Sequence, residues 1–170
     1  MRRVVPDDWQ AYRELRLEAL KDSPLAFVEQ YDDAAARPEL FWRERVEGAA
    51  DGVLSCMFVA EAEGRLVGKA SCFVEGENAD KVSGHVVGVY VTPQARGTGV
   101  AAALLSATVS WALTEARADR VRLFVIETND RAAAFYRRIG FVATGRTMRY
   151  PPDPTYIEYE MEYRPHGVSD

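Results

Sequence analysis

Apolar residues recur at helical spacing in two stretches near the start of the chain. In residues 6–24 they stand mostly three or four apart, at Trp9, Tyr12, Leu15, Leu17 and Leu20, which predicts an amphipathic helix. Residues 38–49 predict a second, shorter helix, with a proline suited to its first turn and Gly48 suited to its end. The segment between them, residues 28–36, is polar and acidic and predicts a connection.

From Cys56 the apolar period changes from helical to alternating. Residues 56–76 predict two strands around a turn at Glu63-Gly64, and residues 83–92 predict a third. The elements that follow are a helix over 100–116, a strand over 120–128, a helix over 129–139 and strands over 141–145 and 157–163. The order ααβββαβαββ predicts an α/β (α+β) fold with a central mixed, mostly antiparallel sheet of about seven strands, flanked by helices on both faces.

Composition limits the classes of function. The chain has 170 residues, 48% hydrophobic and 28% charged, which predicts one domain over residues 1–170. With 21 basic and 26 acidic side chains the net charge is -5, so we expect no nucleic-acid partner. No apolar stretch is long enough for a signal or a membrane span, so we expect a cytoplasmic protein without a membrane partner. A monomer and a homodimer both stay open.

Cysteine and histidine are too sparse for a metal site. Cys56 and Cys72 fall opposite each other if residues 63–64 form the turn, and we favour two buried thiols over a disulfide. His85 and His166 are far apart in sequence, and no acidic cluster accompanies either. We therefore expect no metal.

A turn with two glycines joins the third strand to the following helix. It reads "QARGTGVA" over residues 94–101, and unpaired N–H groups at the start of a helix favour an anion such as phosphate. Gly97 and Gly99 allow positive φ and close approach of a ligand, while Arg96 adds charge. The alternative is that the glycines only make a tight turn. Neither the Walker pattern nor the dinucleotide pattern fits, since Ala102 stands where the latter needs glycine.

Gly88 interrupts an otherwise apolar strand. A glycine there is typical of a bulge or a close backbone approach. If the strand parts from the next parallel strand, its free N–H and C=O groups could pair with an amide-bearing ligand. Amides at one end and a pyrophosphate at the other describe coenzyme A. The alternative is that Gly88 only accommodates a bulky neighbour.

Two segments resemble the GNAT superfamily of acyl-CoA-dependent N-acyltransferases. Residues 94–99, "QARGTG", fit its [QR]xxGx[GA] pyrophosphate motif, and the spacing from Asn129 to Phe141 fits its second cofactor motif. The predicted element order is also similar to that fold. The resemblance implies acetyl-CoA as cosubstrate. The cofactor-binding residues that it implies are Val89, Tyr90, Val91, Gln94, Arg96, Gly97, Thr98, Gly99, Val100, Ala101, Asn129, Ala132, Phe135 and Tyr136.

The implied reaction is transfer of acetyl to a primary amine by direct attack in a ternary complex. A tyrosine hydroxyl can protonate the departing thiolate, and Tyr136 is the candidate general acid, with a core aromatic as the alternative. His85 is the leading candidate for the base; the alternative is that it is an ordinary residue at the end of a strand. Glu127 and Glu29 are the second candidates for the base. A non-catalytic acyl-CoA sensor is the alternative to an enzyme.

In the resembling family the acceptor usually lies between the first two helices and the last two strands. Carboxylates among aromatics there suit a cationic amine, although solvated carboxylates and half-buried tyrosines explain them equally well. We predict a small-molecule or peptide amine without choosing among them. The candidate acceptor residues are Phe27, Glu29, Tyr31, Asp32, Asp33, Trp42, Glu127, Tyr150, Tyr156 and Glu158.

Overall fold

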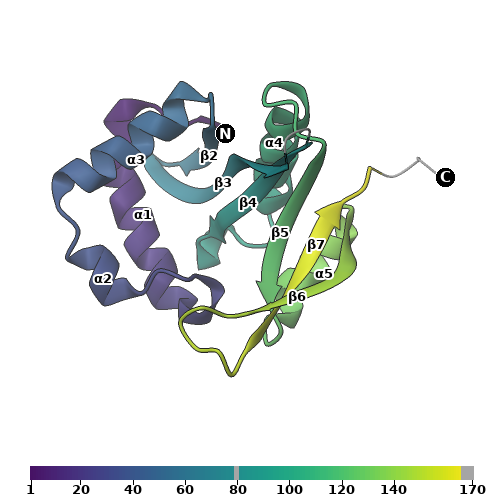
Figure 1. Ribbon diagram of the computed structural model, residues 1–170. Helices are drawn as coiled ribbons and strands as arrows, with labels where there is room; N and C mark the ends of the chain where they lie inside the picture. The colour runs from purple at the N-terminus through teal and green to yellow at the C-terminus, as the bar shows by residue number, and fades with distance from the viewer. Residues whose placement is uncertain (79–80, 166–170) are drawn as a thin grey trace.

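The computed structural model, which describes residues 1–78 and 81–165, is built on one seven-stranded sheet (Figure 1). The strands are β1 (Arg2–Arg3), β2 (Ser55–Ala62), β3 (Arg65–Asn78), β4 (Lys81–Val91), β5 (Arg120–Ile126), β6 (Phe141–Arg149) and β7 (Ile157–Tyr163). The helices are α1 (Trp9–Asp22), α2 (Tyr31–Ala35), α3 (Glu39–Asp51), α4 (Val100–Thr114) and α5 (Asp130–Arg138).

The sheet is mixed and mostly antiparallel. Its order is β1-β2-β3-β4-β5-β7-β6, and only β4 and β5 pair in parallel. The predicted fold class is therefore confirmed.

Each face of the sheet carries its own apolar core, because successive strand residues point to opposite faces. In β2, Cys56 belongs to the core under α4, while Met57 belongs to the core under α1 and α3. Figure 1 shows α1, α2 and α3 together on one side of the sheet. Helices thus cover both faces, as expected.

Three local predictions were wrong. Gly48 does not end its helix: α3 continues to Asp51 and stops at Gly52, whose φ is +72°. The exposed Gly48 costs the helix little, since Trp42, Val46 and Ala49 anchor the opposite face in the core. The acidic connection contains the short helix α2, and the two-residue strand β1 is too short to leave an alternating pattern.

The turn between β2 and β3 is the predicted one. Glu63 and Gly64 have φ values of +52° and +72°, as the two central residues of a tight hairpin turn require. Next to the turn Ala62 pairs with Arg65, and a register shift between Ala60 and Glu61 then places Cys56 directly opposite Cys72. Both are free, buried thiols, as expected, and burial raises the pKa of Cys56 to about 12.

No helix in the described ranges is long and apolar enough to cross a membrane.

Candidate active site

Strands β4 and β5 begin as neighbours and then part. In the described chain they pair only where Ser83–His85 meet Arg120–Arg122. Beyond that point β4 continues to Val91 and β5 to Ile126 without pairing to each other. Their facing N–H and C=O groups are therefore available to a ligand, as the sequence led us to expect.

A bulge at Gly88 accompanies the parting. Val87 pairs with Ser71 and Tyr90 with Lys69, so two residues of β4, Gly88 and Val89, span the space of one residue of β3. Gly88 has a φ of +62°, a conformation that glycine adopts without strain. The Nζ atom of Lys69 donates a hydrogen bond of 2.7 Å to the Gly88 carbonyl and holds the bulge from β3.

A pocket of about 540 Å³ occupies the gap between the parted strands. Its wall includes Val86, Leu123 and Val125, which belong to the α4 core. Val87 and Phe124, their alternating neighbours, also line it. The pocket therefore reaches from one face of the sheet into the other.

The glycine turn and the start of α4 close one end of this pocket. Gly97 and Gly99 line it with φ values of +79° and +87°. The first hydrogen bond of α4 runs from the Ala103 N–H to the Gly99 carbonyl at 3.1 Å, so the three N–H groups before it have no intrahelical partner. This end of the pocket is built to favour an anion.

Most of the predicted cofactor residues meet at this pocket. Those that line it are Val89, Tyr90, Val91, Arg96, Gly97, Gly99, Ala101, Asn129, Ala132, Phe135 and Tyr136. Gln94, Thr98 and Val100 instead line a smaller pocket of about 340 Å³, together with residues of β2 and β3. Their side chains are thus placed on a different surface.

Two of the residues at the large pocket have partners of their own. The Arg96 side chain forms an ion pair with Asp22 and donates to the Val91 carbonyl at 3.1 Å. The Asn129 side-chain oxygen caps α5 by accepting from the Ala132 N–H at 3.1 Å. Asn129 therefore has a structural role that the spacing of the motif did not reveal.

Tyr136 is half-buried in the pocket wall. Its ring packs edge-on against Phe141, with 5.9 Å between centroids, and its hydroxyl has no hydrogen-bond partner in the described structure. Burial raises the pKa of Tyr136 to about 12. The hydroxyl is therefore protonated at neutral pH and free to donate a hydrogen bond.

In the described chain His85 is the last residue of β4 that pairs with β5, and it does not line the pocket. Its ring contacts Phe124, which lines the pocket, and Phe73, with centroids 5.4 and 4.9 Å apart. Burial lowers the pKa of His85, and Arg122 acts in the same direction against Glu75, whose carboxylate is 3.9 Å from Nδ1. The imidazole is thus biased toward its neutral form.

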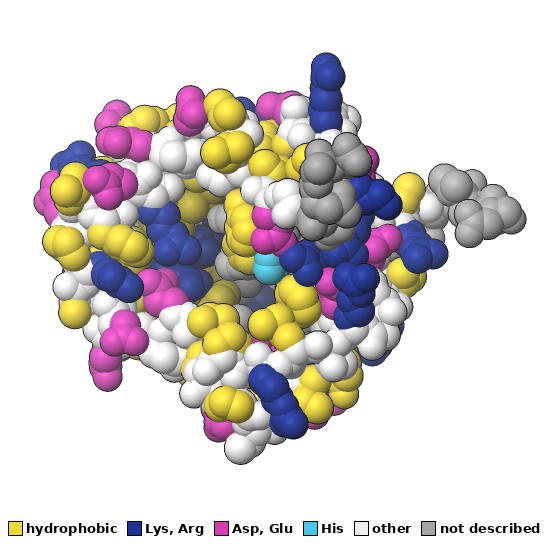
Figure 2. Space-filling model, viewed as in Figure 1, with side chains coloured by type: hydrophobic (Ala, Val, Ile, Leu, Met, Phe, Trp, Pro, Cys, Tyr) yellow, Lys and Arg dark blue, Asp and Glu magenta, His cyan; other side chains and the backbone are white. Residues whose placement is uncertain are grey.

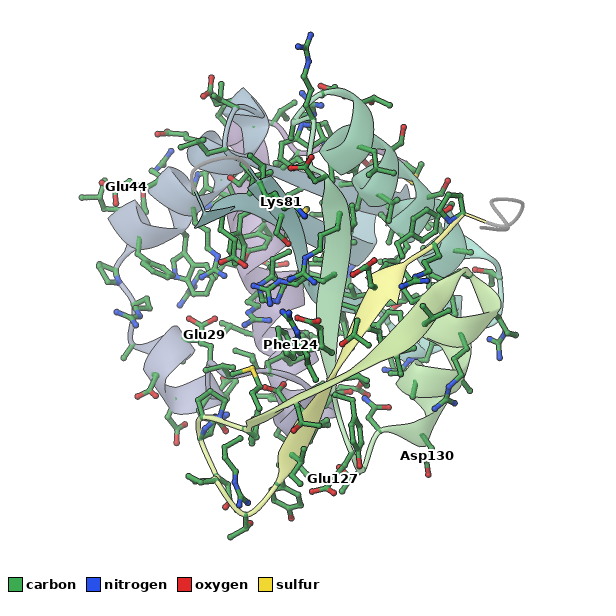
Figure 3. All side chains as sticks on the ribbon, turned by 45° about the vertical axis from the view of Figure 1, so that its right-hand side comes forward. Glu29, Glu44, Lys81, Phe124, Glu127 and Asp130 are labelled. Carbon is green, nitrogen blue, oxygen red and sulfur yellow. The ribbon has the colours of Figure 1, made fainter. Side chains whose placement is uncertain are left out.

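Two of the predicted acceptor residues, Phe27 and Glu158, line the large pocket. Trp42 is a core residue with 0% exposure, packed against Tyr12 and Phe41, and cannot contact a ligand. Glu127 is exposed, and its carboxylate accepts a hydrogen bond of 2.9 Å from the Ile157 N–H. In Figure 3 Glu127 lies at the lower end of the molecule, away from Glu29.

The remaining candidates lie around the pocket without lining it. Glu29 is held by Arg16 at 3.0 Å, and the Tyr31 ring lies 4.3 Å below the Lys21 ammonium. Tyr156 belongs to the turn between β6 and β7. The buried Tyr150 donates to the Phe27 carbonyl at 2.6 Å, so it ties that turn to the segment after α1.

Comparison with known proteins identifies the family. Residues 9–141 match the model of the acetyltransferase (GNAT) family. The chain belongs to this family.

Among GNAT relatives, an uncharacterized N-acetyltransferase of Methanocaldococcus jannaschii is 32% identical over 87 residues, or 51% of this chain and 53% of that protein. A glucosamine 6-phosphate N-acetyltransferase of Trypanosoma brucei brucei is 27% identical over 100 residues, or 58% and 65% of the two chains. The chain thus spans less than two thirds of these relatives.

Solved GNAT structures share the fold. An acetyltransferase of the GNAT family from Streptococcus pneumoniae superimposes with a TM-score of 0.78 over 95% of each chain, at 18% identity.

Three charged pocket residues of this GNAT chain were not assigned to the cofactor or to catalysis from the sequence. Arg131 and Arg138 on α5 and Glu158 on β7 all line the pocket, and Glu158 had been considered only for the acceptor. Arg131 lies four residues before Phe135 and Arg138 three residues after it, so all three share one face of the helix. This spacing could have identified the two arginines as pocket residues. Glu158 is the one carboxylate in the lining, and burial raises its pKa.

No group of three or more histidine, cysteine or acidic side chains is arranged for a metal in residues 1–78 and 81–165. His166 lies outside these ranges.

Proposed function

We propose that this GNAT protein is an N-acetyltransferase that moves an acetyl group from acetyl-CoA to a primary amine, by direct attack in a ternary complex. The observation that carries the proposal is the pocket between the parted strands, which has unpaired helix N–H groups at one end and the Tyr136 hydroxyl in its wall. An extended amide-bearing cofactor with a pyrophosphate suits that arrangement.

The cofactor would lie along the unpaired edge of β4. Backbone groups of residues 89–91 would pair with the pantetheine arm, and the turn over residues 96–101 would hold the pyrophosphate. Arg131 and Arg138, which line the pocket from α5, add positive charge for the phosphates. Arg96 would contribute its backbone, since Asp22 holds its side chain.

Acyl transfer needs a neutral amine and a protonated leaving thiolate. Tyr136 would donate its proton to the thiolate as the C–S bond breaks, because its protonated hydroxyl belongs to a residue that lines the pocket. A backbone N–H near Val89 or Val91 would stabilise the oxyanion.

His85 would accept the proton of the amine. It is biased toward the neutral form, but Phe124 stands between it and the pocket, so a bridging water would carry the proton. Glu158 is the second candidate base, because it lines the pocket directly. Cys56 and Cys72 are unsuited to a covalent route, since burial raises the pKa of both thiols.

The acceptor would be the amine of a small molecule or a peptide. One relative is named for glucosamine 6-phosphate, and one solved structure is of a spermidine N-acetyltransferase. Both names describe amines, which supports an amine acceptor here and leaves its identity open.

The test is calorimetric titration with acetyl-CoA, followed by release of CoA thiol in the presence of an amine panel. Micromolar binding together with amine-dependent thiol release is expected. Binding without release from any amine would favour the acyl-CoA sensor, and absence of binding would refute both.

A further inference from the structure

Three cationic side chains meet on the face of the sheet covered by α1 and α3. They come from α1 (Arg16), α3 (Arg45) and β3 (Lys69), and they surround Tyr12, whose ring lies 5.5 Å from the Lys69 Nζ atom. Burial raises the pKa of Tyr12, and the charges of Arg45 and Arg16 oppose that rise. We call these three residues the cationic cluster.

Glu29 is the carboxylate that partly balances the cluster. It lies 3.0 Å from Arg16, and its charge acts on Lys69 against the two arginines. Lys69 is 2% exposed and gives its hydrogen bond to the Gly88 carbonyl instead of an acid. Burial lowers the pKa of Lys69 well below its ordinary value, and Arg16 and Arg45 lower it further. Because Lys69 is biased toward its neutral form, the positive charge of the cluster resides on Arg16 and Arg45, and among the described residues Glu29 pairs with Arg16 alone.

The guanidinium groups of Arg16 and Arg45 have N–H donors that are available to a ligand. Arg16 is 5% exposed, and its buried Nη1 atom has no hydrogen-bond partner in the described structure. Arg45 is exposed and forms no ion pair with any described residue. Arg122, on the same face of the sheet, differs because both Glu75 and Glu160 pair with it.

The cationic cluster borders the active-site pocket. The Arg16 guanidinium lies 4.5 Å from the centre of the Phe27 ring, and Lys69 bonds to Gly88; both Phe27 and Gly88 line the pocket. Figure 2 shows a hollow on this face with Lys and Arg side chains gathered inside it.

We propose that the cationic cluster binds an anionic group of the acceptor, so that the substrate is an amine that also carries a carboxylate or a phosphate. The inference rests on the proposed acetyl transfer. Guanidinium groups bind both anions through paired hydrogen bonds, and partial burial strengthens the attraction. The expectation of a cationic amine rested on several carboxylates, and one of them, Glu29, is already paired with Arg16.

The first test measures binding without turnover. Inorganic phosphate and acetate are titrated separately into the CoA-saturated protein, and the arginine Nε–Hε signals are followed by NMR. Saturable shifts of Arg16 and Arg45 with either anion are expected, and the anion that binds more tightly identifies the acceptor's group. Arg45→Gln should weaken binding by about tenfold or more, as for loss of a charge-assisted hydrogen bond. Arg43→Gln, an exposed change on the same helix, should not.

The second test uses matched acceptors, glucosamine against glucosamine 6-phosphate and an amino acid against its amide. The anionic member of a pair should have the higher kcat/KM, and Arg45→Gln should raise its KM by about tenfold while leaving kcat and acetyl-CoA affinity unchanged. Because the anion titration needs no turnover, failure of acetyl transfer and failure of the anion site are measured separately. Absence of saturable shifts with both anions, or equal anion binding by Arg45→Gln, would overturn the inference.

Discussion

Filling the space beside Gly97 tests whether the glycine turn holds a pyrophosphate. Gly97 has a φ of +79°, and a Cβ atom there would meet no heavy atom within 4 Å. The Gly97→Leu side chain can therefore enter the pocket without a clash, at a backbone cost of about 1–2 kcal/mol for the left-handed conformation. If it displaces the pyrophosphate from two N–H groups, at about 1.5 kcal/mol each, acetyl-CoA affinity falls about a hundredfold.

Gly145 supplies the matched control for Gly97. It has a φ of +84° and equally open surroundings, but it lies in β6 and does not line the pocket. Gly145→Leu should lower the melting temperature by a similar amount, about 2–4 °C for each kcal/mol of strain, with no change in acetyl-CoA affinity. Calorimetry and thermal melts of both variants make the comparison. If Gly97→Leu bound acetyl-CoA as tightly as Gly145→Leu does, the assignment of the turn would be refuted.

Three further changes test the chemistry and the bulge. Tyr136→Phe should lower kcat by about a hundredfold, as for loss of a general acid, with acetyl-CoA affinity unchanged; full activity would remove Tyr136 from the mechanism. If His85 is the base, the midpoint of the acid limb in a plot of kcat/KM against pH lies below 6.5, the ordinary histidine pKa. That limb should disappear in His85→Gln and persist in Glu158→Gln. The opposite pattern would assign the base to Glu158. Because burial lowers the pKa of Lys69, the unfolded chain holds more protons than the folded one between that lowered pKa and 10.5, so stability rises with pH in that window. Urea unfolding should show a smaller rise in Lys69→Met, and an identical pH dependence would count against a buried, deprotonated lysine.

Short sequence patterns predicted those features of the fold and pocket that depend on residues close together in the chain. The turn at Glu63-Gly64 and the bulge at Gly88 each contain a glycine with positive φ, and the parting of β4 from β5 accompanies that bulge. Alternation in residues 56–76 gave the strands that carry two cores. These features need no knowledge of distant contacts.

Features that depend on distant packing could not be predicted in this way. Trp42 and Tyr31 are both aromatic residues with charged neighbours in sequence, yet Trp42 is enclosed and Tyr31 is half-buried, because α3 packs on α1 and β2. Lys69 gave no sign of burial, since the groups that surround it come from α1, α3 and β4. The cationic cluster arises from segments more than twenty residues apart and is visible only when the chain is folded.

The bulge in β4 also determines what a one-residue deletion would do. Removal of Gly88 would restore simple alternation with Val89 alone between the pairs of Val87 and Tyr90, so Val89, Tyr90 and Val91 would keep their present faces of the sheet. Val89 and Val91 would stay on the α4 core, and the Tyr90 hydroxyl would still face Glu18 on α1, to which it donates at 3.3 Å. The deletion would remove the Gly88 carbonyl, so the buried Lys69 would lose the acceptor of its hydrogen bond.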